Sequence, residues 1–325
     1  MARVIDRLVG HRERLQPLLD AVGCDRLAPT LLFAGPAGVG KKLAALALTQ
    51  ALVCERNKDG NACGDCGSCV RVETGQSENL MMVAPEGASI KIEQARDILQ
   101  FLSLRTLGRA RVVIIDQAHL MNPQSGNALL KALEEPPRGT HFILITHMPA
   151  AILATIRSRS QLARFGPLAN DELKKVLKEL MGKAPDKWVI DCAHGSVEQA
   201  QRMMESREDF VQLENATLDY LSQSFTSFPA EAIQSLKELS RDKTAQAYMS
   251  QLIQGIVRDA MKVSSGIGGE TRWPEVAQAA SALGPRKLGA LAEAALAMEN
   301  DLTRNVERGL VLENFAIHIS QLGRV

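Results

Sequence analysis

The stretch Gly35-Pro36-Ala37-Gly38-Val39-Gly40-Lys41-Lys42 decides the fold of this chain. It follows a short apolar run, residues 30–34, which is typical of a buried strand, and it precedes strong helix formers, residues 43–48. Between a strand and a helix, this glycine pattern predicts a phosphate-binding loop, because inward-pointing backbone N–H groups and a helix N-terminus favour anions. Lys41 is then placed to reach the outer phosphates of a nucleotide.

The last position of this loop departs from the pattern of nucleotide-hydrolysing proteins. Those proteins place Ser or Thr there, and the hydroxyl oxygen ligates Mg²⁺. The chain has Lys42 instead, which carries three hydrogen-bond donors and no acceptor. The loop therefore predicts binding of ATP or ADP but argues against coordination of Mg²⁺. A glycine turn that binds nothing is the simpler alternative.

Length, composition and charge restrict the class of protein. A chain of 325 residues with 46% apolar content predicts two or three domains with substantial cores. A net charge of +1 argues against a strongly basic nucleic-acid-binding protein and leaves local patches open. No uncharged apolar run is long enough to span a membrane, and the N-terminus lacks the apolar core of a signal peptide. We therefore expect a cytoplasmic protein.

Four cysteines lie within sixteen residues and predict a metal site. Cys54, Cys63, Cys66 and Cys69 have the spacing C-x8-C-x2-C-x2-C, interleaved with glycines that allow tight turns. In a reducing compartment such a cluster favours a closed, structural Zn²⁺ site over disulfides, with an iron–sulfur cluster as the chemical alternative. Cys24 and Cys192 are isolated, and we expect both to pack in the core.

Further apolar runs predict a parallel sheet with helices on both faces. The expected additional strands are residues 80–83, 111–116, 141–146 and 161–165, and the expected helices are 13–22, 92–104, a segment at 127–137 stopped by two prolines, and 152–156. The third strand ends in Asp116, which in a phosphate-loop protein would hold Mg²⁺ through water. A core strand that ends in a solvated acid is the alternative. The next residue, Gln117, cannot accept a proton as a carboxylate does.

Beyond Pro167 the pattern is helical only. Acidic residues open one helix near Asp171, and Ser196 is a candidate N-cap of another. Long apolar stripes follow, with breaks at 228–229, 266–269 and 284–285, and the last stripe runs through Leu302, Val306, Leu310, Phe315, Ile319 and Leu322. These faces are either core or an oligomer interface.

Taken in order, these motifs resemble one family. They are similar to the AAA+ clamp-loader subunits of bacterial DNA polymerase III, best of all to the delta-prime type. The motifs are the phosphate loop, the four-cysteine insert, the Ile-Ile-Asp strand end, the stretch Asn127-Ala128-Leu129-Leu130-Lys131-Ala132-Leu133-Glu134-Glu135-Pro136-Pro137 and the stretch Thr155-Ile156-Arg157-Ser158-Arg159-Ser160. The resemblance is strong over residues 1 to about 167 and thinner beyond them.

The resemblance implies a three-domain architecture, α/β followed by all-α. Residues 1–167 would form a RecA-like AAA+ domain with the zinc module at about 54–69, residues 168–206 a small helical lid, and residues 207–325 a helical collar. Subunits of this family form a hetero-pentameric ring that opens the sliding clamp and places it around primed DNA.

The resemblance also implies roles for single residues. Arg159 falls where the family has an arginine finger, which reaches the γ-phosphate bound by a neighbouring subunit, although Ser160 replaces the usual cysteine. A surface arginine with no such role is the alternative. Thr146 falls at the first sensor position. Glu198 stands where motor subunits have the second-sensor arginine, and a carboxylate there would repel a triphosphate.

Three hypotheses follow. The leading one is a clamp-loader subunit with little or no ATP hydrolysis of its own, which supplies Arg159 to a neighbour; Lys42, Gln117 and Glu198 all favour it. The second is an active ATPase motor of the same loader, which would explain the intact Gly35, Gly38, Gly40 and Lys41. The third is a zinc-dependent DNA-binding module, for which the cysteine segment has few basic residues (Arg56, Lys58, Arg71) and no aromatic side chain to stack on bases.

Overall fold

The computed structural model describes residues 3–104, 108–267, 272–304 and 306–323. The chain forms two compact units, Met1–Gln201 and Arg202–Val325, and the division falls inside helix α9, Val197–Glu205. The expected separation of a lid at residues 168–206 from the AAA+ domain and the collar stays a prediction.

The first unit is built on a five-stranded parallel sheet in the order β2-β3-β4-β1-β5. The strands are β1 Thr30–Ala34, β2 Leu80–Val83, β3 Arg111–Ile115, β4 Thr140–Thr146 and β5 Gln161–Arg164. Every residue of β1 and β3 is buried, as expected when helices cover both faces of a parallel sheet. The predicted α/β fold with a parallel sheet is confirmed, and each strand matches its predicted range within one residue at either end.

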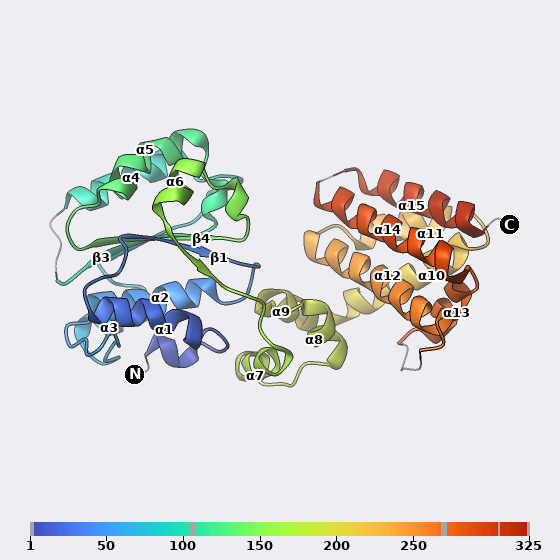
Figure 1. Ribbon diagram of the computed structural model, residues 1–325, viewed down its shortest axis with the longest axis horizontal. Helices are drawn as coiled ribbons and strands as arrows, with labels where there is room; N and C mark the ends of the chain where they lie inside the picture. The colour runs from blue at the N-terminus through green and yellow to red at the C-terminus, as the bar shows by residue number, and fades with distance from the viewer. Residues whose placement is uncertain (1–2, 105–107, 268–271, 305, 324–325) are drawn as a thin grey trace. The chain divides into compact units, whose positions relative to one another are not determined.

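Two layers of helices cover the sheet (Figure 1). Helices α1 Arg12–Gly23, α2 Lys41–Val53 and α3 Gly67–Glu73 lie on one face, and α4 Ile92–Ser103, α5 Pro123–Glu134 and α6 Ala154–Arg159 on the other. Successive side chains of β1 serve the two layers in turn: Leu31 and Phe33 belong to the core under α1 and α2, and Leu32 to the core under α4 and α5. This alternation is the two-residue period of a strand.

One short helix differs from its prediction in a way that affects a site residue. The sequence predicts a helix over 152–156, but α6 begins at Ala154 and continues to Arg159. Ser158 and Arg159 therefore lie in the last turn of a helix. Short 3₁₀ turns, Val4–Arg7, Ala118–Leu120 and Pro149–Ala151, occur next to the main elements.

Three helices complete the first unit: α7 Asn170–Met181, α8 Lys187–Ala193 and the start of α9. The predicted cap of α9 is confirmed, because the backbone N–H of Gln199 donates to Oγ of Ser196 over 3.3 Å. The connection between α8 and α9 also contacts the segment between β5 and α7, where the N–H of Leu168 donates to the carbonyl of Gly195 over 3.2 Å.

In its described residues, the second unit holds helices only, as predicted. They are α10 Arg207–Ser224, α11 Ala230–Leu239, α12 Lys243–Ser264, α13 Pro274–Ser281, α14 Gly284–Thr303 and α15 Arg308–Gly323. Helix α12 packs against α10, α13 and α14. A buried hydrogen bond of 2.6 Å from the hydroxyl of Tyr220 to the carbonyl of Leu312 joins α10 to α15.

The prediction of one final apolar stripe is wrong. Helix α14 ends at Thr303 and α15 begins only at Arg308, so Leu302 and Leu322 belong to different helices. Leu310 is 56% exposed and Val306 41% exposed. Because the helix is interrupted between Thr303 and Arg308, residues on either side of the interruption do not share one helical face. Two glycines of the predicted break at 266–269, Gly268 and Gly269, lie outside the described residues.

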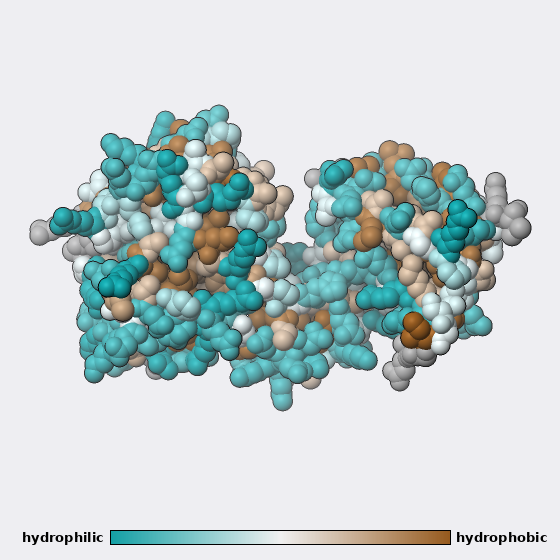
Figure 2. All heavy atoms as spheres, in the orientation of Figure 1, coloured by the Kyte–Doolittle hydropathy of each residue, from teal (hydrophilic) through white to brown (hydrophobic). Residues whose placement is uncertain are grey.

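Across the described ranges, no helix combines the length and the apolar character needed to cross a membrane. The face drawn in Figure 2 is covered largely by hydrophilic residues, with smaller apolar areas between them.

Candidate functional site

The predicted phosphate loop connects β1 to α2, and its backbone has the expected turned form. Gly38 and Gly40 have φ angles of 71° and 97°, a region that favours glycine. A Cβ atom on Gly38 would lie 2.3 Å from Oγ of Ser196 and 2.7 Å from Cβ of Glu198. Gly35 is equally constrained, since a Cβ atom there would lie 2.0 Å from the carbonyl of Phe165. The loop therefore needs glycine both for its turn and for the close approach of α9.

A pocket of about 610 Å³ lies over this loop, at the carboxyl ends of the central strands. This edge of a parallel sheet is where α/β proteins bind ligands. Six of the predicted site residues line the pocket, and Gly35 does not; the six are Gly38, Gly40, Lys41, Lys42, Asp116 and Thr146. The structure thus brings together residues that lie more than 100 positions apart in the sequence.

The ammonium of Lys41 bends back onto its own loop. It donates hydrogen bonds to the carbonyl oxygens of Gly35, at 2.8 Å, and Pro36. Burial lowers the pKa of Lys41 to about 8, and the carboxylates of Asp116 and Glu198 offset part of that effect. The side chain is therefore a buried cation within reach of a phosphate held by the loop.

Lys42 occupies the first turn of α2 and changes the chemistry expected of a metal site. Its ammonium nitrogen lies 3.7 Å from Oδ2 of Asp116. The hydroxyl ligand of Mg²⁺ is thus replaced by a positive charge, and that charge is paired with the carboxylate that would face the cation. Mg²⁺ requires oxygen ligands in near-octahedral geometry, so these residues do not fit a magnesium site.

Gln117 and Thr146 complete the strand ends beside the loop. Gln117 has a φ of 50°, and its N–H donates to Oδ1 of Asp116 over 2.9 Å. Oγ1 of Thr146 accepts a hydrogen bond of 2.9 Å from the N–H of Met148 and lies 3.2 Å from Nδ1 of His119. The Thr146 carbonyl accepts from the N–H of Gly35 over 3.2 Å, which ties the end of β4 to the start of the loop.

Three histidines near the pocket were not singled out from the sequence. His119 and His147 have ring centroids 4.2 Å apart, and burial lowers the pKa of both. His11 packs its ring edge against Phe165, at 5.1 Å, and its Nε2 lies 2.9 Å from the carbonyl of Val39. His147 directly follows Thr146 at a strand end, which is the one sequence signal that pointed to it. His11 is 28 residues from its partner in the loop, and no local pattern announces that contact.

Glu198 lies where the resemblance implied, beside the phosphate loop. It is the second residue of α9 and lines the pocket, and the N–H of its neighbour Val197 donates to the carbonyl of Gly38 over 2.9 Å. A carboxylate thus stands close to the loop, and its correspondence to the second-sensor position stays a prediction.

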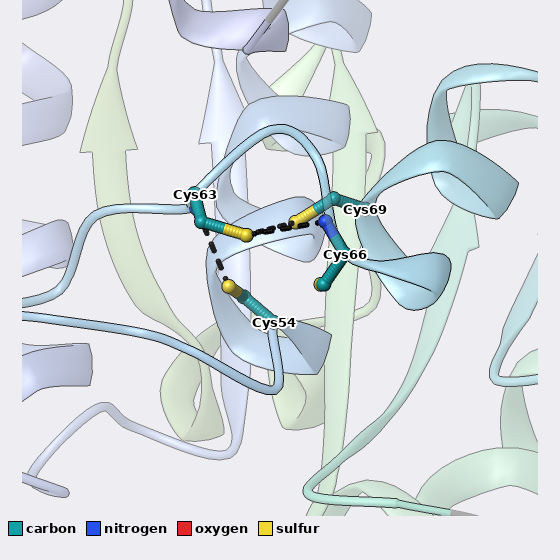
Figure 3. A group of neighbouring side chains, drawn as sticks. All are labelled: Cys54, Cys63, Cys66 and Cys69. Atoms are coloured by element: carbon teal, nitrogen blue, oxygen red, sulfur yellow. Dashed lines mark hydrogen bonds between the residues drawn. The ribbon is translucent and has the colours of Figure 1, made fainter. Parts of the chain in front are cut away.

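The four predicted cysteine ligands converge in a separate site (Figure 3). Their sulfur atoms all lie within 4.8 Å of one another. Cys54 follows the last residue of α2, Cys66 precedes α3, and Cys69 lies in the first turn of α3. Gly60, with a φ of 80°, lets the intervening loop approach α1, because a Cβ atom there would lie 1.8 Å from the carbonyl of Leu19.

The geometry of this cluster fits a tetrahedral zinc ion. Zinc–sulfur bonds of about 2.3 Å place two sulfur ligands about 3.8 Å apart, which is the distance between Sγ of Cys63 and Sγ of Cys69. Backbone N–H groups of Cys63 and Cys66 donate to the sulfurs of Cys54 and Cys63, each over 3.3 Å. Burial raises the pKa of the Cys54 and Cys69 thiols, so a cation is needed to hold them as thiolates.

The two remaining cysteines differ from each other. Cys192 is buried, as predicted, but Cys24 is exposed, because it lies just after the end of α1, where the chain turns away from the core.

The cysteine segment has few free basic side chains that could contact nucleic acid. Arg56 lies 2.7 Å from Asp65 and Arg71 lies 3.2 Å from Glu78, so two of its three basic side chains are paired with acids.

Arg159 lies apart from the pocket, at the exposed C-terminal end of α6. Its Nε lies 2.6 Å from Oε1 of Glu134, the last residue of α5, and its Nη1 donates to the carbonyl of Thr155 over 3.0 Å. The guanidinium is therefore held on two sides by its own chain.

Comparison with known proteins places these features in a family. Residues 10–169 match the family model described as DNA polymerase III, delta subunit. The chain is 38% identical to the delta' subunit of DNA polymerase III from Pseudomonas aeruginosa over 135 residues, which are 41% of this chain and 41% of that one. It is also 38% identical to the delta' subunit from Bacillus subtilis over 154 residues, which are 46% of this chain and 46% of that one. It is 32% identical over 179 residues to the tau subunit of Escherichia coli, which covers 54% of this chain and 27% of that one. The matches span less than half the length of these relatives.

Proposed function

Residues 10–169 belong to the AAA+ clamp-loader family of DNA polymerase III, and from that membership we propose that the chain works as a delta-prime-type subunit of the loader. In this role it joins a hetero-pentameric ring through its helical second unit. The ring opens the sliding clamp and places it on primed DNA in the cytoplasm. The chain is thereby a component of the DNA polymerase III holoenzyme.

We further propose that this subunit binds ATP or ADP but hydrolyses little or none of it. The observation that carries this proposal is the Lys42–Asp116 pair at 3.7 Å in a pocket whose phosphate loop is otherwise intact. The loop, Lys41 and the N-terminus of α2 supply what binding of phosphate requires. The metal ligand and the carboxylate that would activate water are replaced by Lys42 and Gln117, so the groups required for hydrolysis are missing.

Arg159 is the residue that we propose acts on a neighbouring subunit. An arginine supplied in trans stabilises the charge that develops during phosphoryl transfer, and it does so only when two subunits are docked. Its exposed position at the end of α6, outside the chain's own pocket, supports a role toward a partner. Zn²⁺ bound by the four cysteines is proposed as structural, because four thiolates leave no open position for a substrate.

The test is reconstitution of the loader with its other subunits, followed by ATP turnover with DNA and clamp present. We expect negligible turnover by the isolated chain. Arg159→Ala should leave the ring assembled and lower turnover by about tenfold or more, since such fingers contribute orders of magnitude to the rate. Arg157→Ala, two residues earlier on the same helix, is the matched control.

The alternatives give different results. An active motor subunit, which the intact loop favours, would hydrolyse ATP in isolation. A DNA-binding zinc module would bind duplex DNA alone, and the ion pairs at Arg56 and Arg71 do not support it. Unchanged turnover in an assembled Arg159→Ala loader would remove the finger assignment.

A further inference from the structure

Lys42 stands where the nucleotide pocket of this fold would otherwise receive a divalent cation. It is the second residue of α2, it lines the pocket next to Lys41, and its ammonium is directed at Asp116. The position is thus filled by a charge that belongs to the chain itself. Its side chain is 55% exposed, so it retains freedom to turn toward a ligand.

An ammonium group at this position can interact with phosphate oxygens as a metal ion does. A cation beside the phosphates neutralises their charge and bridges their oxygens. Lysine offers one positive charge and three donors, which suits phosphate oxygens. A divalent cation in the same position would face like charge from Lys42 and would find the carboxylate of Asp116 already paired. The residues therefore favour phosphate without metal over phosphate with metal.

We propose that this pocket binds a nucleoside di- or triphosphate without a divalent cation, and that the ammonium of Lys42 takes the place of the metal beside the phosphates. This inference rests on the proposed nucleotide site and adds its metal independence. Binding moves the Lys42 ammonium from Asp116 to a phosphate oxygen, while the backbone around Gly38 and the ammonium of Lys41 hold the remaining oxygens.

The charges that face this site agree with that assignment. Among the residues that line the pocket, Arg7, Lys41 and Lys42 supply three positive charges, and Asp116 and Glu198 supply two negative ones. The residues that line the pocket therefore carry a net positive charge, which offsets part of the negative charge of the phosphates without a metal ion. In the absence of nucleotide, Asp116 pairs with Lys42, and the carbonyl oxygens of Gly35 and Pro36 hold the ammonium of Lys41.

The experiment measures binding of fluorescent N-methylanthraniloyl-ADP to the full chain. Titrations are run in buffer freed of divalent cations on a chelating resin and again with Mg²⁺ added, and the zinc content is checked in both. We expect the two dissociation constants to agree within about twofold. In Lys42→Ser, metal-free binding should weaken by about tenfold or more, and Mg²⁺ should restore part of it, because serine supplies the missing hydroxyl ligand.

Controls keep the outcome decisive. Lys131→Ser removes an exposed lysine of α5 outside the pocket and should bind as the parent does. Circular dichroism establishes that Lys42→Ser is folded, and Lys42→Met serves as a second variant of similar volume.

Two results would overturn the proposal. Parent binding that strengthens about tenfold or more on addition of Mg²⁺ would refute metal independence and leave the nucleotide site standing. Absence of binding in both buffers would remove the nucleotide site as well. The role of the chain in the loader would still be judged separately, by Arg159→Ala.

Discussion

The ammonium of Lys42 and the carboxylate of Asp116 face each other at 3.7 Å across the mouth of the phosphate loop. Their side chains are 55% and 22% exposed, so the pair contributes less than about 1 kcal/mol to stability. Its importance is chemical. The pair joins the two positions that hold Mg²⁺ in related nucleotide-hydrolysing sites, and it leaves neither of them available to a metal.

Asp116→Asn should strengthen metal-free binding of ADP. The substitution removes a negative charge from the pocket and releases Lys42 toward the phosphates, so we expect a gain of about three- to tenfold in affinity. A site that depends on Mg²⁺ would respond in the opposite direction, because it would lose the carboxylate that supports the metal. Fluorescence titration distinguishes the two, with Asp97→Asn on the exposed face of α4 as the control.

Binding of ADP should weaken as the pH rises above about 8, the pKa to which burial lowers Lys41. The protonated lysine binds the phosphates, and the phosphates hold its proton in the complex. Affinity is therefore constant below that pH and falls above it, by at most about tenfold per pH unit. Dissociation constants measured from about pH 7 to pH 9.5 test this. A profile in Lys41→Met that is as steep as in the parent would contradict the assignment.

The same shift in Lys41 has a consequence for folding. An unfolded lysine has a pKa near 10.5, so between about pH 8 and 10.5 the unfolded chain binds this proton more tightly than the folded chain does. Lys41 alone therefore makes the folded state more stable as the pH rises through that range. Comparison of the parent with Lys41→Met in urea unfolding isolates this contribution from the other titrating groups.

Glu134→Ala should lower ATP turnover by the assembled loader less than Arg159→Ala does. Oε1 of Glu134 lies 2.6 Å from Nε of Arg159. Removal of the Glu134 carboxylate therefore keeps the charge of the arginine but lets its side chain adopt other rotamers. The pair is exposed, and its loss should change the free energy of unfolding by less than about 1 kcal/mol. Glu135→Ala, at the next position, is the control. Equal turnover in Glu134→Ala and the parent would show that this contact does not position Arg159.

Loss of one zinc ligand should destabilise the first unit strongly. Elemental analysis is expected to find about one zinc per chain. Cys63→Ala should release that zinc and cost about 4 kcal/mol or more, because the remaining buried thiolates lose their cation. Cys24→Ala is the control, since Cys24 is exposed and outside the cluster. A full zinc content in Cys63→Ala would exclude this residue as a ligand.

The sequence was sufficient wherever the signal is local. Buried strands such as Thr30–Ala34 are continuous apolar runs, and their bounds in the structure match the prediction. The cysteine cluster was also predictable, because all four cysteines lie within sixteen residues and their spacing is typical of a tetrahedral zinc site. The end of α6 was less predictable, since Arg157 to Arg159 suit a last helical turn as well as a loop.

By itself, the sequence determined which chemical groups this protein has, and which it lacks, at its phosphate loop. Lys42, Gln117 and Glu198 are departures that can be recognised from residue type alone. Only the tertiary structure decided what those groups do to one another. Three contacts join residues that lie 25 to about 160 positions apart. They are the ion pair of Lys42 with Asp116, the packing of α9 against Gly38 and the ion pair of Glu134 with Arg159. Such contacts depend on how strands and helices are stacked, and no local pattern in the chain encodes that.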